Sequence, residues 1–197
     1  MGPVKRRNKS QNVREDSGMR GWVWVILMIC IAGYVAGCSV NEGGDPPKPV
    51  LDRKTQENLI KFFADSYVEK DIDRYSESLH DGFLFTFTTE DAELIGLPVD
   101  QPWWGKTPDV VAAGNMFDTP LVSKIEMDLP IEAGPWPTEA GWLYRLEPTI
   151  KVTVDDEGGG EPTTYWVFSS WFYAEIISDP YDSTLWVFKG IEESLKD

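Results

Sequence analysis

The spacing of apolar residues changes from a helical to a strand period along the chain. From Thr55 to Lys70 the apolar residues lie three and four positions apart, which predicts an amphipathic helix capped by the Thr55 hydroxyl. Asp71 predicts the cap of a second, shorter helix over residues 72–79, which Gly82 ends. Aromatic residues alternate with others over 83–88, and that period predicts a β-strand.

The rest of the chain predicts one further helix and then mainly strands. Residues 90–106 have no clear period and contain glycines and prolines around Trp103-Trp104, so we expect a long loop. Thr107-Pro108 opens a third helix, with proline at its first position, that runs to about Phe117. Alternating positions then predict strands over four ranges: 121–129, 142–154, 163–177 and 184–191. A glycine-rich hairpin over 155–162 joins the second and third of these strands, and the fold class is α+β.

The segment before this domain has the parts of a secretory signal. Basic residues stand at positions 5, 6, 7, 9, 14 and 20, and an uncharged apolar run extends from Gly21 to Gly37. The sequence Val35-Ala36-Gly37-Cys38 resembles the processing site of bacterial lipoproteins. That resemblance implies cleavage before Cys38, a diacylglycerol on its sulfur and a further acyl chain on the new amino terminus, which together anchor a protein firmly. The alternative is an uncleaved membrane helix over 21–34, and both interpretations export the rest of the chain.

The chain divides into a signal peptide, 1–37, a lipidated cysteine with a flexible tether, 38–54, and one folded domain, 55–197. We expect a lipid-anchored, extracytoplasmic protein of the bacterial cell envelope whose partner is the bilayer, bound through acylated Cys38. Ser39 is not the aspartate that commonly retains lipoproteins at the inner membrane, which favours the periplasmic face of the outer membrane in a two-membrane cell. Cys30 leaves with the signal, so we expect the domain to fold without disulfides.

The exported part has a strong negative charge. The first 37 residues contain 6 of the 18 Lys and Arg residues but only 2 of the 33 Asp and Glu residues. The remaining 12 basic and 31 acidic residues give a net charge near −19. Because this field repels phosphate backbones, we expect no nucleic-acid partner. The charge favours cationic ligands, unless the scattered acids serve only solubility.

Residues 57–63, 71–75 and 80–85 give an amphipathic helix, an acidic turn, a short helix with a tyrosine, and a strand entered through an aspartate. These three stretches resemble the opening of the nuclear transport factor 2-like superfamily, to which the SnoaL-like proteins and ketosteroid isomerases belong. The resemblance implies a cone, in which a curved antiparallel sheet wraps against three helices around an apolar pocket. Many cones of this superfamily pair through their sheets, so the resemblance allows a homodimer.

The superfamily hosts isomerases, dehydratases and adaptors alike, so the reaction depends on site residues. The oxyanion tyrosine of the ketosteroid isomerases corresponds to Phe63, and their general base corresponds to a position near Phe87. Neither phenyl ring can donate or accept a proton, so we expect no catalytic residue of that kind. The alternative is a SnoaL-like isomerase or dehydratase that uses an acid such as Asp65, Glu90 or Asp91. A buried carboxyl with a raised pKa would favour that alternative.

Metal and cofactor sites are not expected. His80 is the only histidine, which excludes a metal site of two or three histidines, and it is predicted at the exposed end of the second helix. The acids at 155–157 lack the alternating spacing of an EF-hand loop and predict a solvated hairpin tip.

Aromatic residues supply the candidate binding surface. Trp103 and Trp104 fall in the predicted loop, where the superfamily fold has the mouth of the cone, and they either bind a ligand or cover the core. The pocket wall or the core is expected to contain the following rings: Phe63, Phe87, Tyr144, Trp166, Trp171 and Trp186. We therefore expect the cone to bind a small apolar ligand or an envelope protein without catalysis. A spacer role within an envelope complex is a further alternative.

Overall fold

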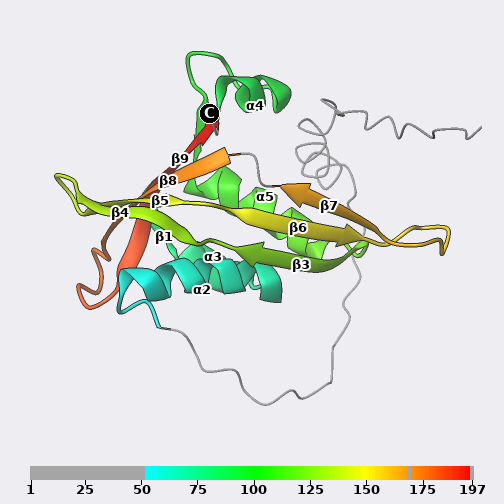
Figure 1. The fold of residues 1–197 in the computed structure, drawn as a ribbon, viewed down its shortest axis with the longest axis horizontal. Coiled ribbons are helices and arrows are strands. Elements are labelled where there is room, and N and C mark those ends of the chain that lie inside the picture. Colours follow the sequence, from blue (N-terminus) through cyan, green and yellow to red (C-terminus); the bar gives the residue numbers. More distant parts are fainter. Residues whose placement is uncertain (1–51, 168–169, 196–197) are drawn as a thin grey trace, which may run out of the picture.

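A computed structural model of the chain describes residues 52–167 and 170–195. The predicted signal peptide, Cys38 and the predicted tether up to residue 51 lie outside the described residues. Within the described ranges, no helix combines the length and apolar character needed to cross a bilayer. Figure 1 shows curved layers of strands packed against helices.

The three predicted helices are present. They are α2 (Gln56–Glu69), α3 (Ile72–Glu77) and α5 (Lys106–Asp118). The Thr55 hydroxyl accepts a hydrogen bond from the Asn58 N–H at 3.1 Å, and the Asp71 carboxylate accepts one from the Arg74 N–H at 3.0 Å. Both predicted caps are therefore confirmed. Pro108 is the third residue of α5 rather than the first.

The boundary between the second helix and the first strand differs from the prediction. Strand β1 (Leu79–Thr86) begins three residues before Gly82, which therefore does not end a helix. The Phe188 N–H donates to the Ser78 carbonyl at 2.8 Å, and Leu79 pairs with Phe188 in the sheet. His80 consequently lies in a strand, and its predicted position at a helix end is wrong.

The predicted loop over 90–106 contains two regular elements. Helix α4 (Thr89–Leu94) is capped by the Thr88 hydroxyl, which accepts from the Asp91 N–H at 3.2 Å. Strand β2 (Trp103–Gly105) pairs with β1, with Phe85 opposite Trp104. The loop prediction fails because each element is short and neither shows a periodic apolar pattern.

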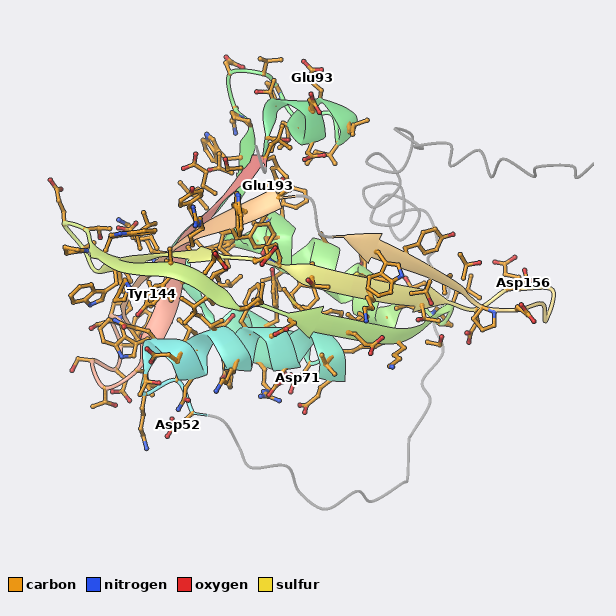
Figure 2. All side chains as sticks on the ribbon, viewed as in Figure 1. Asp52, Asp71, Glu93, Tyr144, Asp156 and Glu193 are labelled. Carbon is orange, nitrogen blue, oxygen red and sulfur yellow. The ribbon has the colours of Figure 1, made fainter. Side chains whose placement is uncertain are left out.

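The remaining strands form two sheets. They are β3 (Val122–Asp128), β4 (Ile131–Pro137), β5 (Trp142–Leu146), β6 (Thr149–Val154), β7 (Thr163–Val167), β8 (Ser170–Ser178) and β9 (Trp186–Leu195). One sheet has the order β2-β1-β9-β8-β5-β4 and the other β3-β6-β7. Every pairing is antiparallel except that of β1 with β9. The hairpin between β6 and β7 projects from the domain, with Asp156 near its tip (Figure 2).

Two predicted strands are each divided between the two sheets. The range 142–154 becomes β5 and β6, and 163–177 becomes β7 and β8. At the first division the Glu147 N–H donates to the Pro130 carbonyl at 3.0 Å, where β3 also gives way to β4. Two neighbouring stretches of chain, β3 to β4 and β5 to β6, therefore pass from the smaller sheet to the larger one, or back, at the same point. The strands bend around the helices there (Figure 1). The described domain is α+β, with a curved sheet and few helices, as predicted.

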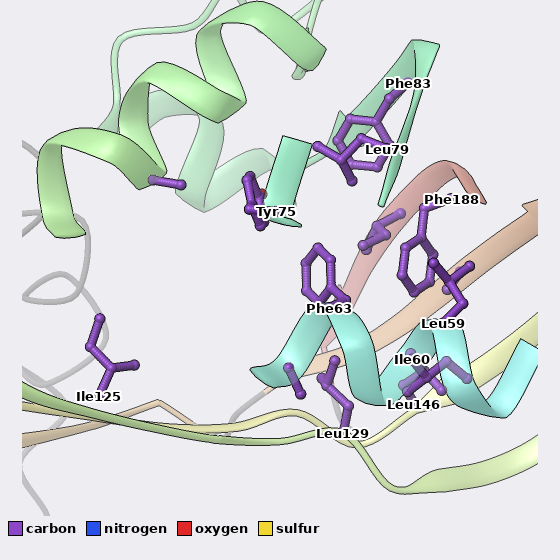
Figure 3. Close-up of a cluster of buried hydrophobic side chains, with 14 of the residues drawn as sticks. Leu59, Ile60, Phe63, Tyr75, Leu79, Phe83, Ile125, Leu129, Leu146 and Phe188 are labelled. Carbon is purple, nitrogen blue, oxygen red and sulfur yellow. The ribbon is translucent and has the colours of Figure 1, made fainter. Parts of the chain in front are cut away.

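The core fills the space between α2 and the sheets (Figure 3). Phe63 of α2 meets Phe188 of β9 with ring centroids 5.1 Å apart. Other buried members of this cluster include Leu59, Ile60, Tyr75, Leu79, Phe83, Ile125, Leu129 and Leu146. Burial of these apolar surfaces is the main stabilising contribution to the fold.

Candidate functional site

The aromatic candidates from the sequence do not gather at one place. Phe63, Phe87 and Tyr144 are buried, and the Tyr144 hydroxyl donates to Gln56 Oε1 at 2.5 Å. Trp186 is half-buried and packs against the core. Trp166 is 48% exposed on the smaller sheet.

The remaining candidates, Trp103, Trp104 and Trp171, also differ in their surroundings. Arg145 covers the ring of Trp171 at 4.7 Å, and Lys151 covers the ring of Trp166 at 4.1 Å. Trp103 is 40% exposed on β2, whereas Trp104 is half-buried beside it. Of these candidate tryptophans, Trp104 is the one that donates a hydrogen bond to a buried carboxyl.

A buried carboxyl lies beside Trp104. Asp109, in the first turn of α5, is 7% exposed, and its Oδ1 accepts from Trp104 Nε1 at 3.0 Å. Its Oδ2 accepts a hydrogen bond from the Tyr75 hydroxyl, and Tyr67 donates a long hydrogen bond, 3.5 Å, to that same hydroxyl. Burial raises the pKa of Asp109 to about 6, although both donors oppose the shift. This network links α2, α3, β2 and α5.

A second carboxyl with a raised pKa lies on the last strand. Glu193 of β9 stands opposite Phe172 of β8, and its Oε2 is a buried atom without a hydrogen-bond partner among the described residues. Burial is the main cause that raises its pKa to about 7, and the neighbouring Asp91 carboxyl of α4 adds to the shift. The Ser170 hydroxyl and the Thr88 N–H oppose it by donating to the ionised form.

Aromatic contacts join the two carboxyls. The rings of Trp104 and Phe87 meet edge to face at 4.8 Å, and Phe87 contacts Phe85 at 4.7 Å. Phe85 in turn meets Phe172 edge to face at 5.7 Å, next to Glu193 in the ladder. Asp109 and Glu193 therefore lie at the two ends of one wall of rings.

Some apolar side chains of the helices and of the helix-facing side of the sheets remain half-buried although they pack on the core. We call this set the inner lining: Tyr67, Phe85, Val110, Met127, Ile150 and Phe172. Met127 and Ile150 are directly opposite each other on β3 and β6, beside the buried pair Ile125 and Val152. Incomplete burial of apolar residues on the core side leaves apolar surface that an apolar ligand could cover.

A separate groove of about 290 Å³ lies between α2 and the turn from β3 to β4. One helical stripe of α2 forms one side of the groove: Glu57, Ile60, Lys61 and Ala64. The other side consists of residues 128–131, and the groove does not include either raised-pKa carboxyl.

The acids suggested by the sequence have different positions. Asp65 is half-buried on α2, Glu90 is exposed on α4, and Asp91 faces Glu193. Asp109 and Glu193 were missed because neither stands in a recognisable motif. Asp109 is a lone acid beside apolar residues in the first turn of α5, and Glu193 lies beyond the predicted end of the last strand, so the sequence did not show that either acid is buried. Within the described ranges, no group of three or more metal-ligating side chains occurs.

Comparisons with known proteins agree with this architecture. No protein-family model matches the sequence, and no curated protein sequence is significantly similar to it. The Kfla4162 protein of Kribbella flavida superposes with a TM-score of 0.54 at 12% identity, covering 72% of this chain and 88% of that one. A Novosphingobium aromaticivorans protein, provisionally described as a scytalone dehydratase, superposes with a TM-score of 0.50 at 8% identity, over 72% and 81% of the two chains.

A nuclear transport factor 2-like protein of unknown function from Shewanella oneidensis also matches, with a TM-score of 0.44 at 10% identity, over 70% of this chain and 94% of that one. The superpositions with the Kribbella flavida and Novosphingobium aromaticivorans proteins agree with the predicted cone, a curved sheet packed against helices. Identities this low establish the fold and leave the activity to the site residues.

Proposed function

We propose that the chain is an exported, lipid-anchored protein whose cone binds a small apolar ligand against the inner lining. The anchor in this proposal is acylated Cys38, and the ligand covers half-buried apolar surface between Met127 and Phe172. The single observation that carries the binding proposal is the inner lining, because apolar side chains on the core side of a sheet are normally covered. Glu193 gives such a ligand a polar group at one end of the ring wall.

A probe titration tests the binding proposal. Naphthalene-type fluorescent probes should bind the wild-type domain, and Met127→Trp should weaken binding at least tenfold by filling the inner lining. Glu126→Trp is the matched control, because Glu126 is the exposed neighbour of Met127 on the opposite face of β3. Equal probe affinity of the two variants would contradict binding at the inner lining.

The alternative function is a small enzyme of isomerase or dehydratase type. Glu193 favours it, because a carboxyl whose pKa is raised to about 7 can take and return a proton near neutral pH. Conjugation of β,γ-unsaturated ketones, followed by absorbance, is the direct assay. Loss of turnover in Glu193→Gln with retained probe binding would establish catalysis. If the wild type converts none of these ketones, the enzyme alternative is contradicted and the binding function stands.

The lipid anchor has its own test. Cys38→Ser should move the protein from the membrane to the soluble fraction if acylated Cys38 is the anchor. If the apolar run over 21–34 is an uncleaved helix, the variant should stay in the membrane at its full mass. The homodimer, or docking of an envelope protein, stays a prediction that crosslinking in intact cells can examine.

A further inference from the structure

Helix α4 stands apart from the other helices. It lies in the segment that connects β1 to β2. The two ends of this segment are joined by a hydrogen bond from the Phe87 N–H to the Pro102 carbonyl at 2.8 Å. Figure 1 shows α4 beyond the end of β9, away from α2, α3 and α5. Only Ala92 among its residues is buried, while Leu94 is exposed. The helix is thus held to the domain by few interactions, and the contact with Glu193 is one of them.

The contact between α4 and β9 brings two acidic side chains, Asp91 and Glu193, close together. Asp91 accepts a hydrogen bond from the Thr88 hydroxyl at 2.7 Å and faces the Glu193 carboxyl, 102 positions further along the chain. Figure 2 shows Glu193 beneath the helix that carries Glu93. If both carboxyls were ionised, Glu193 Oε2 would be a buried anionic oxygen with no donor, next to a second negative charge. A protonated Glu193 removes the repulsion and can donate its proton to Asp91.

We propose that α4 is a gate over the Glu193 end of the inner lining, held shut by a proton that Glu193 shares with Asp91. When Glu193 loses this proton to solvent, the two carboxylates repel, and the helix moves away together with the segment up to Pro102. Opening exposes the Glu193 carboxyl to water, where its ionised form is stable. The gate concerns access to the cone and does not depend on what binds there.

The groups around Glu193 support this mechanism. Asp91 is the charged side chain that acts on it from α4, and β8 contributes the neutral Ser170 and Phe172. The Thr88 N–H at the start of α4 is the remaining polar neighbour. Among the described neighbours that act on Glu193, no cation compensates the second negative charge, so the shared proton is the stabilising element.

Amide hydrogen exchange of the full chain in detergent micelles tests the gate. After correction for intrinsic exchange rates, protection of amides in residues 88–102 should fall about tenfold or more between pH 5 and pH 8, since one pKa unit corresponds to a tenfold change in population. Glu193→Gln and Asp91→Asn each remove the charge pair and should keep these amides protected at both pH values. Glu192→Gln is the matched control, because Glu192 is exposed and adjacent on the same strand, and it should behave as the wild type.

Two results would overturn the gate. Protection of residues 88–102 that is unchanged between pH 5 and pH 8 in the wild type would show that the shared proton does not hold α4. A loss of protection in both charge-removing variants as large as in the wild type would assign the opening to another group. Neither result bears on probe binding by Met127→Trp, so failure of the gate and failure of the binding proposal are distinguishable.

Discussion

At the scale of single residues, Asp109 has the clearest structural role. Its two oxygens accept from Tyr75 and Trp104, so the carboxyl ties α3 and β2 to the first turn of α5. A buried carboxyl that satisfies two buried donors is costly to delete, because both donors are then left without acceptors. Asp109 therefore stabilises the wall of rings without needing contact with a ligand.

Replacement of Asp109 gives the first stability prediction. Asp109→Ala should lower the free energy of unfolding by about 2–4 kcal/mol, because it leaves the Tyr75 hydroxyl and the Trp104 N–H unsatisfied. Asp109→Asn keeps an acceptor for Trp104 and should stay within about 1 kcal/mol of the wild type at pH 7.5. Urea unfolding of the three proteins gives the comparison, and equal stability of Asp109→Ala and wild type would contradict the bracing role.

The sequence could not identify this residue or Glu193. A single acid between apolar neighbours reads equally well as solvated, and only the packing of Tyr75 and Trp104 around Asp109 shows that it is buried. The comparison with the ketosteroid isomerases singled out Phe63 and Phe87, and both are buried, Phe63 in α2 and Phe87 directly after β1. Contacts between residues far apart in the sequence determined the rest of the candidate site.

At the scale of elements, the helix caps make a quantitative prediction. Thr55→Ala removes the hydroxyl that accepts from the Asn58 N–H and should cost about 1 kcal/mol, and Asp71→Ala should cost a similar amount. Thr55→Ser keeps the hydroxyl and is the matched control. Thermal unfolding measures the differences, and a Thr55→Ala variant as stable as Thr55→Ser would show that the cap contributes nothing.

Replacement by alanine should have opposite effects on stability at two glycines. A Cβ on Gly141, directly before β5, would lie 2.1 Å from the Ile176 carbonyl oxygen, so Gly141→Ala should cost about 2 kcal/mol or more. A Cβ on Gly114 in α5 would make ordinary contact with Ile72 at 3.6 Å, and Gly114→Ala should add about 0.5–1 kcal/mol. Urea unfolding measures both differences. If both variants changed the free energy of unfolding in the same direction, the packing described around Gly141 and Gly114 would be wrong.

Element type was easier to predict from the sequence than element limits. The strongly amphipathic α2 was predicted with its cap, whereas β4 was missed because Gly134, Pro135 and Pro137 interrupt its pattern on a sheet edge. The strands over 142–154 and 163–177 were each predicted as one, since the alternation continues across the point where the chain changes sheet. Periodicity shows which residues lie on the same face of a strand, but it does not show to which sheet the strand belongs.

At the scale of the whole molecule, the two raised pKa values set the pH dependence of stability. Asp109, with a pKa of about 6, and Glu193, with a pKa of about 7, bind protons in the folded state that the unfolded chain has already released. Their contribution is therefore fully present below about pH 4 and is lost as the pH rises to 7, by roughly 2–3 kcal/mol for each group.

This pH dependence has a matched comparison. The double variant Asp109→Asn/Glu193→Gln should lose less stability between pH 4.5 and pH 7.5 than the wild type. Unfolding in urea across that range measures the slope, with Glu192→Gln as the control that retains both buried acids. Parallel pH profiles for the wild type and the double variant would show that neither acid is protonated in the folded state.

Ligand binding by the cone is the central claim for the molecule, and native mass spectrometry tests it most directly. The full chain is extracted from its own cell envelope in detergent, and its native mass is compared with its denatured mass. We expect a small adduct that is lost on denaturation and is absent from Met127→Trp purified in the same way. A native mass equal to the denatured mass in the wild type, with bound lipid accounted for, would contradict the claim that the inner lining holds a ligand.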